Sequence, residues 1–133
     1  MTAFETKRLP AARDTIAPDG SDVRVLLRLG QNGSMAHFAL AAGQTSKAVT
    51  HKTVEEIWYF VGGRGEMWRV QDGQPESIVP VESGVCLTIP LGTRFQLRST
   101  GSEPLAVVGV TIPSWPTDCE EAVPVAGHWT PTV

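Results

Sequence analysis

His51 and Glu56 are the residues of this chain whose types and spacing best suit chemistry. They lie in the stretch 43–65, GQTSKAVTHKTVEEIWYFVGGRG. An imidazole beside a carboxylate can transfer protons or bind a divalent transition metal. His37 precedes this stretch and His128 lies near the C-terminus, and each is a further candidate ligand. For both, a surface or hydrogen-bonded position is the more common role of a histidine.

Alternation along two expected strands predicts which side chains share a face. Successive side chains of a strand point to opposite faces, so Val49 and His51 point the same way. In the strand that follows, Glu56, Trp58 and Phe60 share a face, while Glu55 points away from it. The sequence therefore predicts that His51 and Glu56 approach each other inside the molecule.

A carboxyl group in an apolar interior is difficult to ionise unless it is paired, because burial disfavours the charged form. His51 is the obvious partner of Glu56. We hypothesise that they form a hydrogen-bonded pair that acts as acid and base, as isomerases and cyclases require; the alternative is a buried structural pair without turnover. The apolar residues expected around the pair either line a ligand pocket or only fill the core: Val49, Trp58, Phe60 and Phe95.

Length and composition predict one soluble all-β domain. The chain has 133 residues, of which 41% are hydrophobic and 19% are charged. Its thirteen glycines and ten prolines indicate many short strands joined by tight turns. We expect an irregular N-terminal arm over 1–20, a barrel over 21–113 and a tail rich in Pro and Trp over 114–133, packed on the barrel or on a partner subunit.

Charge and hydrophobicity exclude several classes of partner. The net charge of −3 comes without a cluster of Lys and Arg, so neither nucleic acid nor an anionic membrane is an expected partner. The N-terminus MTAFETKRLP has no apolar core, and a cytoplasmic location is expected. Cys86 and Cys119 are widely spaced and are expected to be free thiols.

Turn residues divide the rest of the chain into strands. Strands are expected over 23–29 and 35–41, joined by a two-residue hairpin loop in which Asn32-Gly33 supplies the positive φ angles. Gly62 to Gly65 make another turn, and 105–112 is expected to be a last buried strand. In 95–98, Phe95 and Leu97 are expected to point inward, which leaves Arg94 and Gln96 facing outward.

The stretch around His51 resembles the first motif of the cupin superfamily, which reads Gly, five residues, His-x-His, three or four residues, Glu, six residues, Gly. Gly43, His51, Glu56 and Gly63 match that pattern, whereas Val49 replaces the first histidine.

The stretch 84–101, GVCLTIPLGTRFQLRSTG, resembles the second cupin motif. Gly84, Pro90 and Gly92 match, but Phe95 replaces the histidine and Ser99 the asparagine. The turn-forming half of the motif is therefore present, and its ligand is missing.

The resemblance covers most of the chain from about residue 20 onward and is to small bacterial single-domain cupins. It implies a double-stranded β-helix, a jelly-roll barrel, and a homodimer that pairs through its sheets. It also implies a barrel metal site of three histidines and a glutamate. Because only His51 and Glu56 remain, no cofactor or a weakly bound divalent metal (Fe, Mn, Ni or Zn) is expected, unless His37 completes the site.

Two functions follow as expectations. The first is a barrel that binds a small molecule at a degraded or metal-free site, as a sensor, a carrier or a metal-independent enzyme. The alternative is a metal-dependent dioxygenase, isomerase or lyase that uses His51 and Glu56 as ligands. The loss of two ligands favours the first function, and the retention of His51 and Glu56 favours the second.

Overall fold

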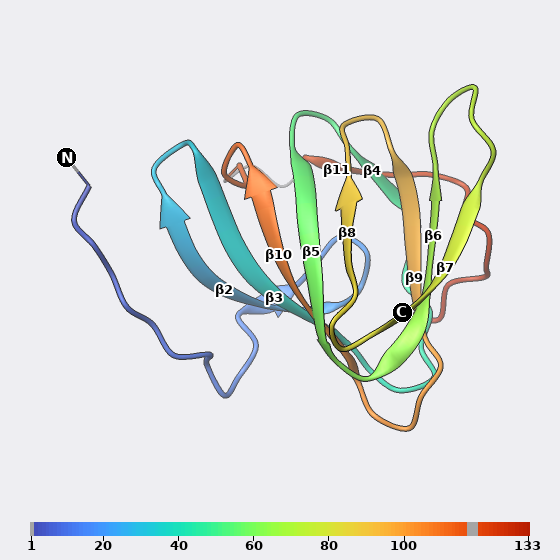
Figure 1. The fold of residues 1–133 in the computed structure, drawn as a ribbon, viewed down its shortest axis with the longest axis horizontal. Coiled ribbons are helices and arrows are strands. Elements are labelled where there is room, and N and C mark those ends of the chain that lie inside the picture. The colour runs from blue at the N-terminus through green and yellow to red at the C-terminus, as the bar shows by residue number, and fades with distance from the viewer. Residues whose placement is uncertain (1, 117–119) are drawn as a thin grey trace.

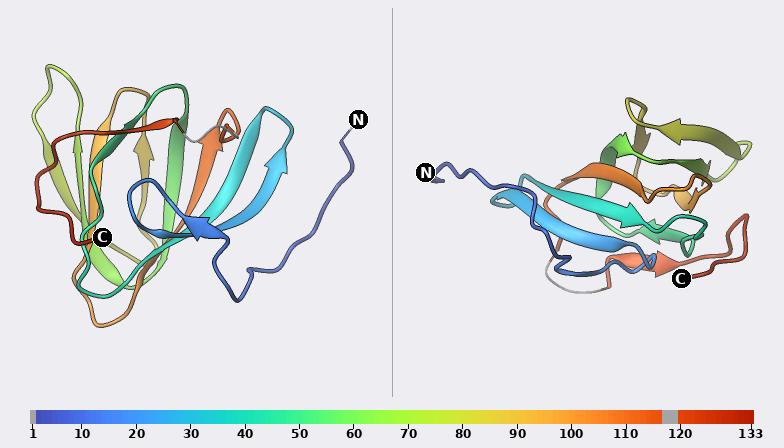
Figure 2. Two further views of the ribbon diagram at one scale, coloured as in Figure 1. Left: turned by 180° about the vertical axis from the view of Figure 1, so that it is seen from behind. Right: turned by 90° about the horizontal axis from the view of Figure 1, so that it is seen from below.

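Two antiparallel sheets face each other in the computed structural model, which describes residues 2–116 and 120–133 (Figure 1). The six-stranded sheet has the order β1-β2-β3-β10-β5-β8, and the five-stranded sheet has the order β11-β4-β9-β6-β7. The view from below in Figure 2 shows the two layers. The strands are β1 (Thr15–Ile16), β2 (Asp22–Leu29), β3 (Gly33–Leu40), β4 (Val49–His51), β5 (Glu55–Gly62), β6 (Arg64–Val70), β7 (Ser77–Glu82), β8 (Cys86–Ile89), β9 (Arg94–Ser99), β10 (Leu105–Ile112) and β11 (Ala122–Pro124).

The predicted all-β jelly roll, a double-stranded β-helix, is confirmed. The described residues contain no helix, and therefore none long and apolar enough to cross a membrane. Cys86 is a free, exposed thiol, as expected, whereas Cys119 lies outside the described residues.

Strand β5 follows the alternation expected from its sequence. Its residues are exposed and buried in turn, so that Glu56, Trp58 and Phe60 point inward and the side chains between them point outward. Ile57 and Tyr59 are 50% and 52% exposed on the outer face. One strand thus supplies both an inner wall of the barrel and an apolar outer surface.

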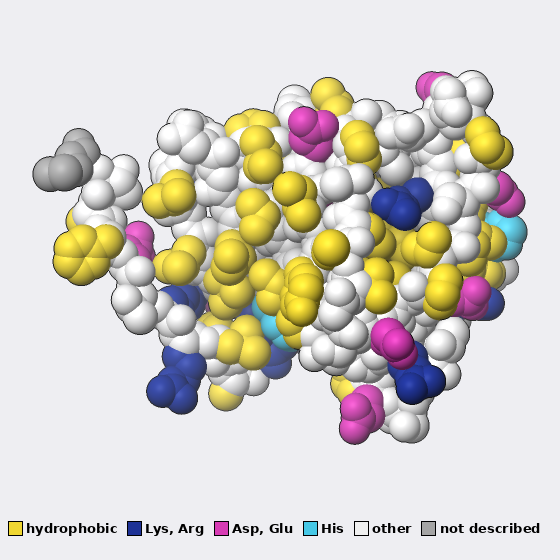
Figure 3. All heavy atoms as spheres, viewed as in Figure 1, with side chains coloured by type: hydrophobic (Ala, Val, Ile, Leu, Met, Phe, Trp, Pro, Cys, Tyr) yellow, Lys and Arg dark blue, Asp and Glu magenta, His cyan; other side chains and the backbone are white. Residues whose placement is uncertain are grey.

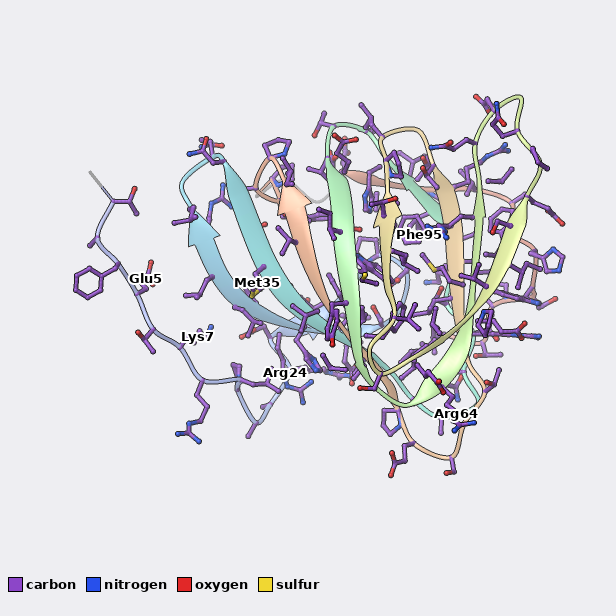
Figure 4. The ribbon with its side chains drawn as sticks, in the orientation of Figure 1. Glu5, Lys7, Arg24, Met35, Arg64 and Phe95 are labelled. Carbon is purple, nitrogen blue, oxygen red and sulfur yellow. The ribbon has the colours of Figure 1, made fainter. Side chains whose placement is uncertain are left out.

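The core lies between the two sheets and is closed by large apolar side chains. Phe60, Met67, Leu105 and Val107 are inaccessible to solvent. Burial of this apolar area is the main force that holds the sheets together. Phe95 of β9 also points into the barrel, as its label in Figure 4 shows, and Leu97 is buried beside it as predicted.

Strand β10 lies at the centre of the six-stranded sheet, between β3 and β5. Its inward residues are buried, so the expectation of a buried strand over 105–112 is confirmed. A register shift in its pairing with β5 falls between Ala106 and Val107.

Two turns are fixed by glycine, and one of them differs from the prediction. The loop between β2 and β3 does not use Asn32-Gly33 for positive φ angles; Gly30 has φ +53°, and Asn32 N donates to Leu29 O at 2.9 Å. Asn32 tolerates the left-handed region, but Gly30, two residues earlier, adopts it at no steric cost. In the β5–β6 turn, Gly63 has φ +75°, and a Cβ atom there would collide with the Pro104 backbone.

The C-terminal tail crosses the outer surface of the five-stranded sheet, where Figure 2 shows it from behind. Its strand β11 pairs with β4. Gln96 faces outward as expected, yet it is fully buried because the tail covers it. Its amide nitrogen donates to Ser46 O and Trp129 O, and its Oε1 accepts from the backbone N–H groups of His128 and Trp129.

The N-terminal arm begins away from the barrel and then approaches it (Figure 4). Glu5 and Lys7 lie on the part that extends away from the barrel. Arg24 of β2 fixes the following part through hydrogen bonds to Pro10 O and Ala11 O. The short strand β1 then pairs with β2 and leads into the segment 17–20 beside the barrel opening.

Candidate functional site

His51 and Glu56 converge at one end of the barrel interior. β4 presents His51 and β5 presents Glu56, and both side chains are almost fully buried. Nδ1 of His51 lies 3.7 Å from Oε2 of Glu56. This distance is too long for a hydrogen bond, so the expected direct hydrogen bond is not formed. The gap is suited to a third atom that bridges the two groups.

A small cavity of about 30 Å³ adjoins this pair. A volume of this size holds a water molecule or two. Val49, Trp58 and Phe95, for which a pocket wall and a core position were both open, line this cavity and also belong to the hydrophobic core. The other lining residues come from β3, the arm and the tail: Ala17, Pro18, Asp19, Phe38, Trp115 and Ala122.

Burial acts in opposite directions on the two ionisable groups. Loss of hydration lowers the pKa of His51 to about 4, although the charge of Glu121 acts to raise it. Burial raises the pKa of Glu56 to about 8, and nearby Asp19 raises it further. The Trp58 indole N–H acts to lower it, although its geometry falls short of a hydrogen bond. At neutral pH both His51 and Glu56 are therefore predominantly uncharged.

Two polar atoms at the cavity have no hydrogen-bond partner among the described residues. They are Nδ1 of His51 and Nε1 of Trp58, and both are buried. An unsatisfied buried donor or acceptor is costly, on the order of 1–3 kcal/mol. The cavity therefore presents hydrogen-bonding capacity that the protein itself does not use.

Trp115 and the segment 17–19 close the cavity on the side away from the core. The ring of Trp115 packs edge-on against His51, with 5.3 Å between the ring centroids. Asp19 is buried and accepts hydrogen bonds from the backbone N–H and the hydroxyl of Ser21. Burial raises the pKa of Asp19, although its hydrogen bonds from Ser21 and the charge of Lys47 act to lower it.

Glu121 of the tail anchors the loop between His51 and Glu56. Its carboxylate accepts hydrogen bonds from the backbone N–H groups of Thr53 and Val54 and from the Thr53 hydroxyl. Burial acts to raise the pKa of Glu121, but these hydrogen bonds outweigh it and lower the pKa. The tail therefore contributes a carboxylate that acts electrostatically on His51.

Sequence reasoning did not identify Asp19, Trp115 or Glu121. Asp19 falls in the N-terminal arm over 1–20, which was expected to be irregular. Trp115 was expected to pack on the barrel or on a partner, and the sequence contains no indication of which surface it would cover. Each of the three residues reaches the site through contacts between segments far apart in the chain.

Three candidate residues lie elsewhere, and for two of them this corrects the prediction. Phe60 packs in the core beneath Trp58 and does not line the cavity, because it lies one layer deeper on β5. His37 cannot join His51, because its neighbour Phe38 points into the cavity and His37 therefore points to the outer face. His128 lies on the tail, stacked on Trp68.

The residues at the site do not fit a divalent metal. Within residues 2–116 and 120–133, no group of three or more His, Cys, Asp or Glu side chains could hold one. His51, Glu56 and Asp19 are the donors that line the cavity, but Asp19 already accepts two hydrogen bonds from Ser21. Val49 and Phe95 occupy the positions of the other two ligands that the cupin resemblance implies. Two apolar side chains at ligand positions leave too few donors for firm binding.

Comparison with known proteins identifies the fold through structure. No protein-family model matches the sequence, and no curated protein matches it significantly. Ectoine synthase from P. lautus is 21% identical, with a TM-score of 0.71, and the alignment covers 96% of this chain and 94% of that one.

Two further structures extend the similarity. The capsular polysaccharide assembling protein CapF from Staphylococcus aureus is 12% identical, with a TM-score of 0.70; 82% of this chain aligns to 32% of CapF, so the chain spans about a third of that protein. The cupin domain of Schizosaccharomyces pombe Cnp3 is 11% identical, with a TM-score of 0.62 over 70% of this chain and 61% of that one.

Proposed function

Since the chain has the cupin fold, we propose that its barrel binds a small uncharged molecule beside His51 and Glu56 without a metal ion. The observation that carries this proposal is the pair of unpartnered buried atoms, Nδ1 of His51 and Nε1 of Trp58, at one mostly apolar cavity. Ligand sites of this kind combine apolar walls with a few convergent polar groups.

The polar groups define the chemistry of the ligand. The Trp58 indole can only donate a hydrogen bond, whereas neutral His51 and protonated Glu56 can each donate one and accept one. A ligand hydroxyl or carbonyl group satisfies this set without bringing a charge into the apolar cavity. The aromatic walls formed by Phe38, Phe95 and Trp115 suit an apolar or flat body attached to that group.

A molecule larger than water requires the cavity to open. The described volume of about 30 Å³ does not hold one. Trp115 and the segment 17–19 are the elements whose displacement opens it, because they belong to the tail and the arm rather than to the strands of the core. Binding is therefore coupled to movement of these two segments.

The same groups support a sensor, a carrier or a metal-independent enzyme. Near pH 7 Glu56 is a competent proton donor, since its pKa of about 8 lies close to the working pH. His51, with a pKa of about 4, is a weak base. This imbalance favours binding over rapid acid and base catalysis.

The alternative is a metal-dependent enzyme of the dioxygenase, isomerase or lyase kind that uses His51 and Glu56. It requires donors beyond the two that these residues supply. Elemental analysis of protein purified without a chelator or a histidine tag, with His51→Ala as the control, separates the two functions. Stoichiometric metal that disappears in His51→Ala would establish the alternative and overturn the metal-free site.

The binding proposal is tested with phenol, which carries one hydroxyl group on an apolar ring, and with benzene as the matched compound without it. We expect phenol to shift the NMR resonances of the Trp58 indole and of His51 in protein treated with EDTA. Benzene is expected to bind more weakly, and Glu56→Gln to weaken phenol binding. Equal binding of both compounds, or shifts confined to the outer surface, would contradict the proposal.

A further inference from the structure

A second and larger cavity, of about 220 Å³, lies where the edges of the two sheets meet. β7 is the edge strand of the five-stranded sheet, and β8 is the edge strand of the six-stranded sheet. The cavity is lined by residues of β6, of the turn that leads to β7, and of the end of β8, the region labelled in Figure 1. It shares no lining residue with the cavity at His51.

Arg69 is the charged residue that lines this cavity. It is the ladder partner of Phe95 and of Ser77, and its Nη1 donates to Thr88 O of β8 at 2.8 Å, across the junction of the sheets. Its Nε atom is buried and has no hydrogen-bond partner among the described residues. The guanidinium is thus fixed at the cavity with part of its donor capacity unused.

No carboxylate neutralises Arg69 within the part of the chain that the structure describes. The two acidic residues that adjoin lining residues in the sequence have other partners: Asp72 pairs with Arg94 at 3.2 Å, and Glu76 accepts from the indole of Trp68 at 3.0 Å. Partial burial lowers the pKa of Arg69, which is the effect expected of a cation without a counter-charge. The cavity therefore has an uncompensated positive charge.

The remaining polar lining consists of uncharged amides and hydroxyls. Gln71 donates to the hydroxyl oxygen of Thr93 at 3.2 Å, which leaves its own amide oxygen and the Thr93 hydroxyl hydrogen for other partners. Gln74 and Ser77 add an amide and a hydroxyl on the open side. Such a lining suits a ligand that carries polar groups in addition to a negative charge.

We propose that this cavity binds a small hydroxylated carboxylate, whose carboxylate pairs with Arg69 and whose hydroxyl group hydrogen-bonds to the amides and hydroxyls around it. A planar guanidinium matches a carboxylate in shape and charge. One arginine balances a single negative charge, which favours a carboxylate over a phosphate dianion. The volume lies below the roughly 300–1,000 Å³ of sites for drug-sized ligands, so the ligand is small.

The test is an NMR titration with glycolate, with its neutral amide glycolamide as the matched probe. We expect saturable shifts at Gln71, Ser77 and the Arg69 side chain with glycolate, and far smaller shifts with glycolamide. Arg69→Met is expected to weaken glycolate binding by about tenfold or more, because a charge-assisted hydrogen bond is lost. Arg94→Met, at a neighbouring arginine that already pairs with Asp72, is expected to leave binding unchanged.

Two further variants keep the outcome decisive. Ser77→Leu fills the cavity from its exposed side, and it is expected to abolish binding even if Arg69→Met fails to fold. His51→Ala is expected to leave glycolate binding unchanged, because His51 does not line this cavity. The glycolate proposal and the phenol proposal can therefore fail independently of each other. Equal affinities in wild type, Ser77→Leu and Arg69→Met, or tighter binding of inorganic phosphate than of glycolate, would overturn the assignment.

Discussion

His51 and Glu56 are uncharged at neutral pH because burial favours the neutral form of each. A neutral imidazole beside a neutral carboxylic acid attracts hydrogen-bonding groups rather than ions. This protonation state follows from the apolar walls, and in particular from Val49 and Phe95 at positions where the cupin resemblance implies histidines. Val49 and Phe95, in place of the two motif histidines, therefore remove two metal ligands and also favour the uncharged forms of His51 and Glu56.

Stability is expected to fall between pH 6.5 and 8 because of Glu56. Its pKa is about 4.5 unfolded and about 8 folded, so its contribution is complete below pH 4.5 and is lost as the pH rises through 8. The lowered pKa of His51 gives stability that is complete above pH 6.5, so His51 does not act in this window. At about 1.4 kcal/mol per pH unit, the fall is about 2 kcal/mol.

Urea denaturation of the wild type at several pH values measures this fall. Glu56→Gln is expected to remove it, since the amide does not titrate. His51→Gln is expected to retain it. A wild-type free energy of unfolding that stays constant from pH 6.5 to 8 would mean that Glu56 is not protonated in the folded state.

Restoring the two missing ligands is expected to create metal binding. Val49→His and Phe95→His together would surround Glu56 and His51 with a full donor set, because Val49 and Phe95 are paired across β4 and β9. We expect affinity for Ni²⁺ or Mn²⁺ to rise by about 100-fold or more. Isothermal titration calorimetry measures the gain, and His51→Ala in the same background should cancel it. Equal metal affinity in the wild type would contradict our account of the site.

At the scale of elements, the site is formed by strands of the two sheets together with the C-terminal tail and the N-terminal arm. β4 and β5 supply His51 and Glu56, but Trp115, Glu121 and Asp19 come from segments outside the barrel strands. The tail is fixed by Gln96, and Trp129 packs under the guanidinium of Arg98, at 4.4 Å. Loss of the tail should therefore affect the cavity as well as stability.

Gln96→Leu is expected to destabilise the protein by about 2–4 kcal/mol, because it leaves backbone groups of Ser46, His128 and Trp129 without partners. The tail should then be cleaved readily in limited proteolysis, whereas the barrel should resist. The matched control is Gln31→Leu in the exposed β2–β3 turn, for which we expect little change. Equal proteolysis of the two variants would show that Gln96 does not hold the tail.

At the scale of the whole molecule, one face of the six-stranded sheet is strongly apolar. Figure 3 shows hydrophobic side chains gathered over β2, β3, β10 and β5, and Figure 4 places Met35 on this face. Ile57, Tyr59 and Val61 are its exposed members on β5. We propose that a second copy of the chain covers this face, since exposed apolar patches are typical of interfaces and a patch that meets its own copy across a two-fold axis forms a closed dimer.

Tyr59→Lys is expected to weaken self-association at least about tenfold, because it places a charge in the middle of the proposed interface. Sedimentation velocity over a range of concentrations measures the effect. Ile78→Lys, at an exposed residue of β7 in the other sheet, is the control and should leave association unchanged. A wild-type monomer at high micromolar concentration would refute the proposal.

The sequence predicted the parts of this molecule that depend on local rules. Alternation identified the inward face of β5, and the glycines and prolines indicated short strands joined by turns. The jelly roll itself was implied by the resemblance to the two cupin motifs. It did not predict that Gly30 rather than Asn32 takes the positive φ angle, since either residue suits a turn. Asp19, Trp115 and Glu121 were missed because their positions depend on packing between distant segments. Alternation excludes His37 only once the structure shows that its neighbour Phe38 lines the cavity.

The central position of β10 has a consequence for the order in which the chain folds. β10 pairs with β3 on one side and with β5 on the other, and both of these strands come much earlier in the sequence. Until residues 105–112 have been synthesised, both strands have bare edges that can pair with other chains. Such non-local pairing is typical of folding in milliseconds to seconds. The nascent chain is therefore expected to be most prone to aggregation just before β10 leaves the ribosome.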